Sequence, residues 1–238
     1  MVTERSKSGP GDTPGDRQFF GRRKGHTLRP RQRARLEARL PELRLDLKSP
    51  APAALASLFP VPVNDIWLEI GFGGGEHLIH QATENPDAGL LGAEPFINGL
   101  SRMLQQLDEA GAQNVRIHDD DARFLLQWLP DESIARAFIL YPDPWPKRRH
   151  HRRRFVSAGN LALLARVMKP GACLTIASDI PDYIRTSLIA VFQEGSFRWT
   201  AEGPDDWRKK SPDWPVTRYE EKARAAGRIS AYLVMERR

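Results

Sequence analysis

The chain has 238 residues, a net charge of +6 at pH 7 and a single cysteine, Cys173. Its length is ordinary for one α/β domain and sufficient to bury a sizeable core. One cysteine excludes an internal disulfide and any metal site built from several cysteines, and it favours a reducing, cytoplasmic setting. No apolar run approaches the ~20 residues of a membrane span, and the first residues lack a signal-peptide core. We therefore expect a cytoplasmic protein with no membrane association.

The positive charge is concentrated at the N-terminus. Residues 1–39 hold eleven lysine and arginine residues against four acidic ones, whereas the rest of the chain is close to neutral. Such basic segments attract polyanions, because neutralising phosphates releases counterions; a merely solubilising terminus is the alternative. Segment 1–30 is also poor in aliphatic residues, so we expect it to be disordered alone, with a short helix within 22–35. We divide the chain into a basic arm, residues 1–35, and one domain, residues 36–238.

From residue 65 onward, short apolar runs alternate with segments of helical periodicity. The runs predict buried strands at 66–70, 89–94, 114–118, 136–141 and 172–178, and a C-terminal strand within 228–237 that is expected to be antiparallel. The helical segments lie at 75–84, 96–110, 121–128 and 156–168. Strand–helix alternation predicts an α/β fold, with a mainly parallel sheet and helices on both faces.

A glycine-rich turn, L-E-I-G-F-G-G-G-E-H at 68–77, follows the first predicted strand. Glycines such as Gly71 and Gly73 let the backbone turn sharply and let a ligand approach closely. A dinucleotide-binding turn has the pattern G-x-G-x-x-G, but Glu76 stands where that pattern requires its last glycine. Glu69, two residues before the first glycine, suits a cationic ligand such as S-adenosylmethionine better than a pyrophosphate. A tight turn that binds no ligand is the alternative.

Acidic residues also follow the next two predicted strands. Glu94 ends the second strand, where a carboxylate can accept hydrogen bonds from ribose hydroxyls. Asp121 or Asp120, after the third strand, can accept one from an adenine amino group, whereas Asp119 and Asp120 are equally suited to cap the following helix. Because ligands of open α/β sheets lie at the carboxyl ends of the strands, these residues predict an adenosine pocket.

The stretch Y-P-D-P-W-P-K-R-R-H-H-R-R-R-F, 141–155, places Asp143 between two prolines, whose fixed φ angles stiffen the loop. Trp145 can stack on a base or pack beneath the loop, and the sequence does not decide between them. Adjacent histidines without cysteine or acidic partners at ligand spacing argue against a metal site. The basic residues of this stretch are expected to hold the phosphates of a polyanion, and they are Lys147, Arg148, Arg149, Arg152, Arg153 and Arg154. A solvated charged turn is the alternative.

Together these motifs resemble the bacterial tRNA (guanine-N7)-methyltransferases, a branch of the S-adenosylmethionine-dependent Rossmann-like enzymes. The resemblance also rests on G-A-E-P, D-D-A-R, A-S-D-I-P-D-Y and T-R-Y-E-E-K, and it spans most of 65–225. The block P-D-P-W-P-K is its specific part, since many methyltransferases share the glycine-rich turn. Tyr141 stands where a phenylalanine is more usual in the family.

The resemblance implies functional roles for two groups of residues. Residues expected to contact the methyl donor are Glu69, Gly71, Gly73, Glu94, Asp121 and Asp143, the last of which is also the expected catalytic residue. Residues expected to bind the tRNA substrate are Lys147, Asp179, Thr217, Arg218, Tyr219 and Glu220. The alternative for Asp179 is an N-cap of the following helix, and the alternative for 217–222 is a plain turn. The resemblance also implies a variable-loop guanosine as the target. We expect a monomer or a weak homodimer.

Guanine N7 already carries a lone pair, so methyl transfer to it needs no strong base. Aligning N7, the methyl carbon and the sulfur is worth up to ~7–11 kcal/mol when the geometry is ideal. Asp143 is expected to accept hydrogen bonds from guanine N1–H and the 2-amino group, and to stabilise the positive charge that develops on the ring. We therefore assign it an orienting and electrostatic role. The alternatives are an RNA-binding protein without chemistry on the same fold and an NAD-dependent oxidoreductase, which the glycine pattern and Glu69 disfavour.

Overall fold

The computed structural model describes residues 19–212 and 214–238. Its centre is a seven-stranded sheet in the order β3-β2-β1-β4-β5-β7-β6. Strands β1 to β5 run parallel, whereas β7 pairs antiparallel with both β5 and β6. The strands are β1 (Asp65–Ile70), β2 (Ala88–Ala93), β3 (Val115–His118), β4 (Ile134–Leu140), β5 (Met168–Ser178), β6 (Phe197–Trp199) and β7 (Ala231–Arg237). This arrangement confirms the predicted α/β class and its antiparallel C-terminal strand.

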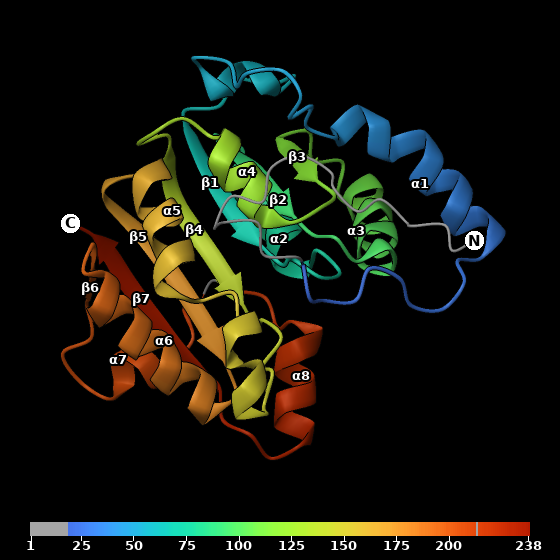
Figure 1. Ribbon diagram of the computed structural model, residues 1–238. Helices are drawn as coiled ribbons and strands as arrows, with labels where there is room; N and C mark the ends of the chain where they lie inside the picture. Colours follow the sequence, from blue (N-terminus) through green and yellow to red (C-terminus); the bar gives the residue numbers. More distant parts are fainter. Residues whose placement is uncertain (1–18, 213) are drawn as a thin grey trace, which may run out of the picture.

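Helices cover both faces of the sheet (Figure 1). One apolar cluster joins the sheet to α4, α5 and α6, and a second joins it to α1, α2 and α3. Because both faces are covered, the central strands are nearly continuous apolar runs, and β2 is buried at every position. The helices are α1 (Pro30–Leu43), α2 (Glu76–Glu84), α3 (Ile97–Ala110), α4 (Ala122–Trp128), α5 (Ala158–Val167), α6 (Pro181–Glu194), α7 (Asp205–Arg208) and α8 (Arg218–Ala225), with 3-10 helices η1 (Leu55–Leu58) and η2 (Arg148–Arg153).

The structure differs from the sequence-based expectation at several boundaries. β5 begins at Met168, four residues before the predicted start, because Met168 pairs with Ile134 ahead of a register shift in the β4–β5 ladder. The three-residue strand β6 was not predicted, since so short a run has no clear periodicity. The helices after β5, α6 to α8, were not assigned from the sequence either.

The basic arm is partly integrated into the domain. The helix expected within 22–35 spans Pro30–Leu43 and buries Leu36, Leu40 and Leu43, so the expected boundary at residue 35 falls inside it. Residues 19–29 have no regular secondary structure, and residues 1–18 of the segment expected to be disordered lie outside the described residues. Within the described residues, no helix is both long enough and apolar enough to cross a bilayer.

Candidate functional site

A cavity of about 400 Å³ opens at the carboxyl ends of the parallel strands, where ligands of this fold class bind. Its volume lies within the range of about 300–1,000 Å³ that is usual for small-molecule sites. It is lined by the ends of β1 and β2, the start of α4, the loop after β4 and part of α8. Of the residues expected to bind the donor, those that line it are Gly71, Gly73, Glu94, Asp121 and Asp143.

The glycine-rich turn holds Glu94 in place. Gly71 and Gly73 have φ angles of 74° and 59°, in the left-handed region that favours glycine. This turn aims the Gly73 N–H at Glu94 Oε2, at 2.8 Å, and the Phe96 N–H donates to Oε1 at the same distance. Burial raises the pKa of Glu94 to about 7, partly offset by these two hydrogen bonds, and the nearby Asp143 and Glu69 carboxylates raise it further. The structure therefore places a carboxyl that titrates near neutrality against the cavity.

Glu69 occupies a different position from the other donor residues. It is buried and lines a second, small cavity together with Gly71, His77 and Tyr219, instead of the large one. His77 Nδ1 lies 2.8 Å from Glu69 Oε2, and the His77 ring packs edge-on against Phe138. This contact fixes the orientation of the carboxyl from the α2 side. The sequence analysis did not single out His77, although its place in the first turn of the helix after the glycine-rich turn was a signal.

The three aspartates after β3 have separate partners. Asp121 is the N-cap of α4: its Oδ1 accepts from the Arg123 N–H at 3.0 Å, and its carboxylate also pairs with the Arg123 guanidinium. Asp120 pairs with Arg23 at 2.6 Å, and Asp119 with Arg44 at 2.5 Å. The capping role thus belongs to Asp121, which also lines the cavity, and the other two carboxylates tie the N-terminal part of the chain to this end of the sheet.

Asp143 lies in a loop with a constrained backbone. Tyr141 and Trp145, two residues before and after it, have φ angles of 50° and 42°, which are unfavourable for residues other than glycine. The Tyr141 hydroxyl lies 3.0 Å from Ser230 Oγ, and its ring stacks on Tyr219. The Asp143 residue is exposed, but its carboxyl borders the cavity, where loss of water raises its pKa; the positive charge of Arg22 opposes this.

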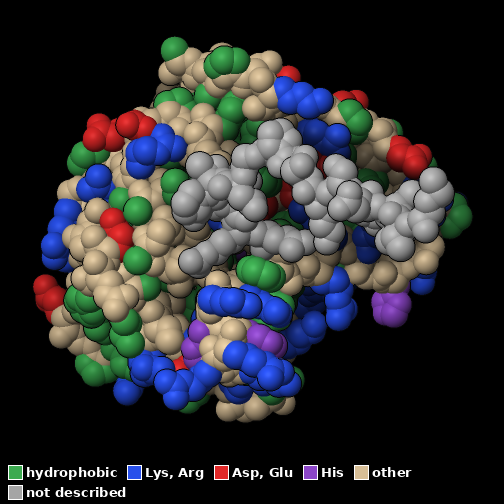
Figure 2. All heavy atoms as spheres, viewed as in Figure 1, with side chains coloured by type: hydrophobic (Ala, Val, Ile, Leu, Met, Phe, Trp, Pro, Cys, Tyr) green, Lys and Arg blue, Asp and Glu red, His purple; other side chains and the backbone are tan. Residues whose placement is uncertain are grey.

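The basic stretch forms a charged ridge beside the cavity. Figure 2 shows lysine, arginine and histidine side chains gathered on the part of the face where Figure 1 draws η2. Arg153 is half-buried, and its guanidinium lies over the rings of Trp145 and Phe20, at 4.9 and 5.0 Å from their centroids. Trp145 thus has packing partners within the loop, and it also lines the large cavity, so both of its expected roles stay open. The exposed residues of the ridge are Lys147, Arg148, Arg149 and Arg152.

Arg154 departs from the expectation that it contacts a phosphate. Its side chain is 3% exposed, and its Nη2 donates to Asp182 Oδ2 at 2.7 Å. Its Nε donates to the Pro144 carbonyl at 2.9 Å. Since these contacts direct the guanidinium into the protein, we do not count Arg154 among the candidate RNA contacts.

Apart from Lys147, which lies on the charged ridge, the residues expected to bind tRNA fall into two places. Asp179 follows β5 and its carboxylate pairs with Arg228 at 2.5 Å. Thr217 is the N-cap of α8, and Glu220 pairs with Lys210 at 3.1 Å, so both have structural partners in this chain. Of this helix, Tyr219 reaches the large cavity. A Cβ at Gly73 would lie 3.0 Å from the Tyr219 ring, so the glycine-rich turn and α8 are in close contact. The Arg218 guanidinium lies over the Tyr219 ring.

The sequence analysis missed residues 19–22 as part of the cavity wall. The segment after them is held by the start of α3: the Gly25 N–H donates to Asn98 Oδ1 at 2.8 Å, and Asn98 Nδ2 donates to the His26 carbonyl at 2.7 Å. The adjacent Phe19 and Phe20, in an otherwise polar arm, were the available signal. Among the described residues, no group of three or more His, Cys, Asp or Glu side chains is arranged to hold a metal ion.

Comparison with known proteins gives a consistent result. A family model described as "Putative methyltransferase" matches residues 63–232. The tRNA (guanine-N(7)-)-methyltransferase of Rhizobium meliloti (strain 1021) is 54% identical over 219 residues, covering 92% of this chain and 94% of that protein. The protein of the same name from Ruegeria sp. (strain TM1040) is 52% identical over 225 residues, covering 93% and 88%.

Solved structures resemble this one at the level of the fold. The 16S rRNA methyltransferase KamB superposes with a TM-score of 0.54 at 16% identity, covering 74% of this chain and 88% of that one. An antibiotic-related methyltransferase gives a TM-score of 0.52 at 17% identity, covering 74% and 89%. At such identities the likeness concerns the fold alone.

Proposed function

Because the chain belongs to the tRNA (guanine-N(7)-)-methyltransferase family, we propose that its cavity binds S-adenosylmethionine and a tRNA guanosine together and transfers the methyl group to guanine N7. The variable-loop guanosine is the proposed target, as the resemblance implies. The match covers 94% and 88% of these two relatives, so the proposal draws on the named activity of the whole relative and not on that of a single shared domain.

The residues of the cavity suit this donor. S-adenosylmethionine carries an ammonium and a sulfonium, and the pKa values of Glu94 and Asp143 are both raised because their carboxyls lose water there. A bound cation would compensate that loss, whereas a pyrophosphate would add negative charge beside it. We assign Glu94 to the ribose hydroxyls and Asp121 to the adenine amino group. Glu69, behind Gly71, is assigned to the cationic end of the donor.

The chemistry follows from alignment. When bound, the donor supplies an electrophilic methyl group on a sulfonium leaving group. Asp143 accepts hydrogen bonds from guanine N1–H and the 2-amino group, which orients N7 and stabilises the positive charge that develops on the ring. The strained loop around Asp143 restricts where this carboxylate can point. No proton has to leave N7, and Asp143 therefore need not act as a general base.

The charged ridge at η2 and the exposed arginines of the arm are assigned to the RNA backbone. Contacts to phosphates position a nucleic acid without reading its sequence. Lys147, Asp179 and the start of α8 are assigned to the substrate close to the target base. A guanine within the folded tRNA has to be turned outward before its N7 can reach the cavity. Contacts from the charged ridge and from the start of α8 would hold the RNA around the base in that position.

The observation that carries this proposal is the convergence of Glu94 and Asp143 on one cavity beside the charged ridge. The test is incubation of unmodified tRNA with the protein and S-adenosylmethionine labelled in its methyl group, followed by nuclease digestion and mass spectrometry. We expect labelled 7-methylguanosine at one position of the tRNA. Tight tRNA binding without any transfer would instead support the RNA-binding protein without chemistry.

A further inference from the structure

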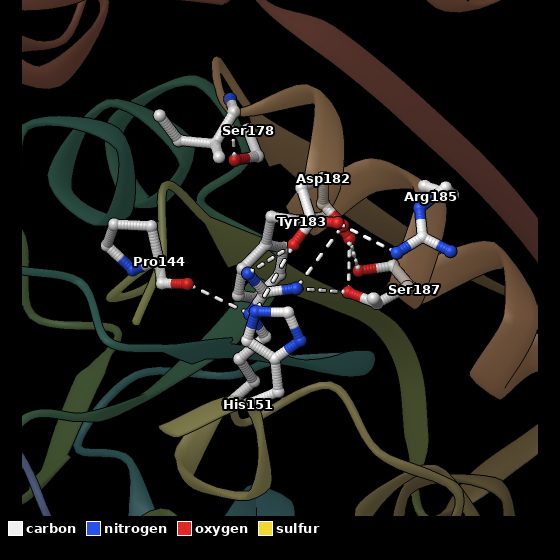
Figure 3. A network of polar contacts seen from close by, with 10 residues as sticks. Pro144, His151, Ser178, Asp182, Tyr183, Arg185 and Ser187 are labelled. Atoms are coloured by element: carbon white, nitrogen blue, oxygen red, sulfur yellow. Dashed lines mark hydrogen bonds and ion pairs between the residues drawn. The ribbon is translucent and has the colours of Figure 1, made fainter. Parts of the chain in front are cut away.

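Arg154 joins the loop that carries Asp143 to the first turn of α6. Its Nε donates to the Pro144 carbonyl at 2.9 Å, one residue after Asp143. On the other side its Nη2 donates to Asp182 Oδ2 at 2.7 Å and its Nη1 to Thr186 Oγ1 at 2.7 Å. Figure 3 shows Pro144 on one side of this network and Asp182, with its neighbours on α6, on the other. The guanidinium thus bridges two segments that are distant in sequence.

The loop needs such a support because its backbone is strained. The positive φ angle of Trp145 comes directly after Pro144, and that of Tyr141 lies at the loop's other end. Strained backbone persists only where the surrounding structure over-determines it. The Tyr141 end is held by its hydroxyl contacts with Ser230 and Tyr232. The bond from Arg154 to Pro144 is the corresponding constraint at the other end.

Asp182 supplies the charge that makes a buried Arg154 acceptable. A buried guanidinium without a counter-charge is strongly unfavourable. Hydrogen bonds from Arg185 and then Arg154 lower the pKa of Asp182 to about 2, so it stays ionised at any pH suited to the reaction. His151 Nε2 lies 3.4 Å from the same carboxylate. Arg185 approaches Asp182 Oδ1 from the solvent side, at 2.8 Å, and is itself exposed.

We propose that Arg154 and Asp182 are positioning residues, which hold Pro144 and so fix Asp143 for methyl transfer. This inference rests on the proposed function. It assigns Arg154 a positioning role, whereas its place in the basic stretch suggested a phosphate contact. It predicts that the two residues influence the transfer step and not the affinity for RNA. A phosphate-binding arginine would do the reverse, weakening RNA binding and its salt dependence.

The test compares Asp182→Ala, Asp182→Asn and Arg154→Lys with the wild type, with Arg185→Ala as the matched control on the same carboxylate. Single-turnover methyl transfer, donor affinity and tRNA affinity at several salt concentrations are measured for each. We expect transfer to slow by about 10- to 100-fold in Asp182→Ala and Arg154→Lys, since a small misplacement of a reacting group has effects of this size. Asp182→Asn keeps an acceptor oxygen, so its transfer rate should lie between those of Asp182→Ala and the wild type. Donor and tRNA affinities should stay within about twofold, and Arg185→Ala should behave as the wild type.

Hydrogen exchange provides a readout that does not depend on the reaction. In Asp182→Ala we expect faster exchange of the amides at Asp143, Trp145 and Lys147, with the central strands unchanged. If the wild type transfers no methyl group, the proposed function fails while this exchange result still decides the inference. Unchanged transfer and exchange in all three variants would overturn it. So would a loss of tRNA affinity with a reduced salt slope in Arg154→Lys, which would return this residue to the phosphate contacts.

Discussion

Glu94 shows how backbone geometry sets the chemistry of a single carboxyl. Two backbone N–H groups hold it against the cavity, yet burial raises its pKa to about 7. The folded-state pKa of Glu94 exceeds the ordinary value of about 4.3. Between about pH 4.3 and 7, the folded protein therefore binds a proton at Glu94 that the unfolded chain releases. Its contribution to stability is therefore complete at low pH and is lost as the pH rises through about 7.

Donor binding should show the opposite dependence on pH. Ribose hydroxyls donate to an ionised carboxylate, so affinity for S-adenosylhomocysteine, the demethylated product, should increase as the pH rises from 6 to 8. Titration calorimetry of the wild type and Glu94→Gln measures this. We expect the variant to bind more weakly at pH 8 and to show little of the pH dependence. A wild-type affinity that is flat across this range would contradict the ribose assignment.

The sequence was informative at the residue scale where a side chain's position follows from its strand. Glu94 ends one predicted strand and Asp143 lies two residues after another, and the carboxyl ends of parallel strands meet at one edge of a sheet. The positions of the Arg154 and Glu69 side chains were harder to predict, because the burial of a charged side chain depends on partners outside its own motif. Asp182, the partner of Arg154, lies 28 residues further along the chain, on a helix whose range was not predicted.

At the scale of elements, the segment before α1 is the least expected part of the site. It runs along the start of α3 and the β3–α4 loop, and residues 19–22 line the cavity. Its sequence is polar and basic, so composition predicted disorder and phosphate binding. What composition could not reveal was the set of partners, such as Asn98 and Asp120, that accept or donate hydrogen bonds along the segment.

Asn98→Ala should loosen this segment and weaken donor binding. The change removes two hydrogen bonds to the backbone at Gly25 and His26, each worth on the order of 1 kcal/mol. We expect the dissociation constant for S-adenosylhomocysteine to rise by roughly threefold to tenfold in titration calorimetry. Arg198→Ala, which removes an exposed ion pair with Glu236, is the control and should have no effect. Equal affinities for Asn98→Ala and the wild type would show that the segment does not contribute to donor binding.

For the whole molecule, the question is where RNA is held. The strand pattern predicted the sheet well, because its central strands are covered on both faces and read as continuous apolar runs. Charge alone predicted candidate RNA-binding regions but not their limits. Residues 1–18 contain three basic and three acidic residues, so the excess positive charge of residues 1–39 lies at 19–39. There, Arg29, Arg31 and Arg33 are exposed at the start of α1 and just before it.

Removing charge from these two regions should have different effects. The triple variant with Arg29, Arg31 and Arg33 changed to alanine should bind tRNA more weakly, and its salt slope should fall by about 1 for each RNA phosphate that is no longer neutralised. Deletion of residues 1–18 should leave the slope within error of the wild type. Filter binding across a salt series measures both. A deletion that lowers the slope as much as the triple variant would place RNA contacts in 1–18.

The role of Asp143 is the central claim, and single-turnover methyl transfer by Asp143→Ala, measured alongside its affinity for S-adenosylhomocysteine, tests it most directly. Asp143 lines the cavity wall beside Glu94 but is assigned to the guanine, so the variant should keep donor affinity within about threefold. Its transfer to tRNA should slow on the order of 10²–10³-fold, as when a group that stabilises transition-state charge is removed. If donor affinity fell by the same factor as the transfer rate, Asp143 would act only as part of the donor site. A rate equal to that of the wild type would contradict the mechanism altogether.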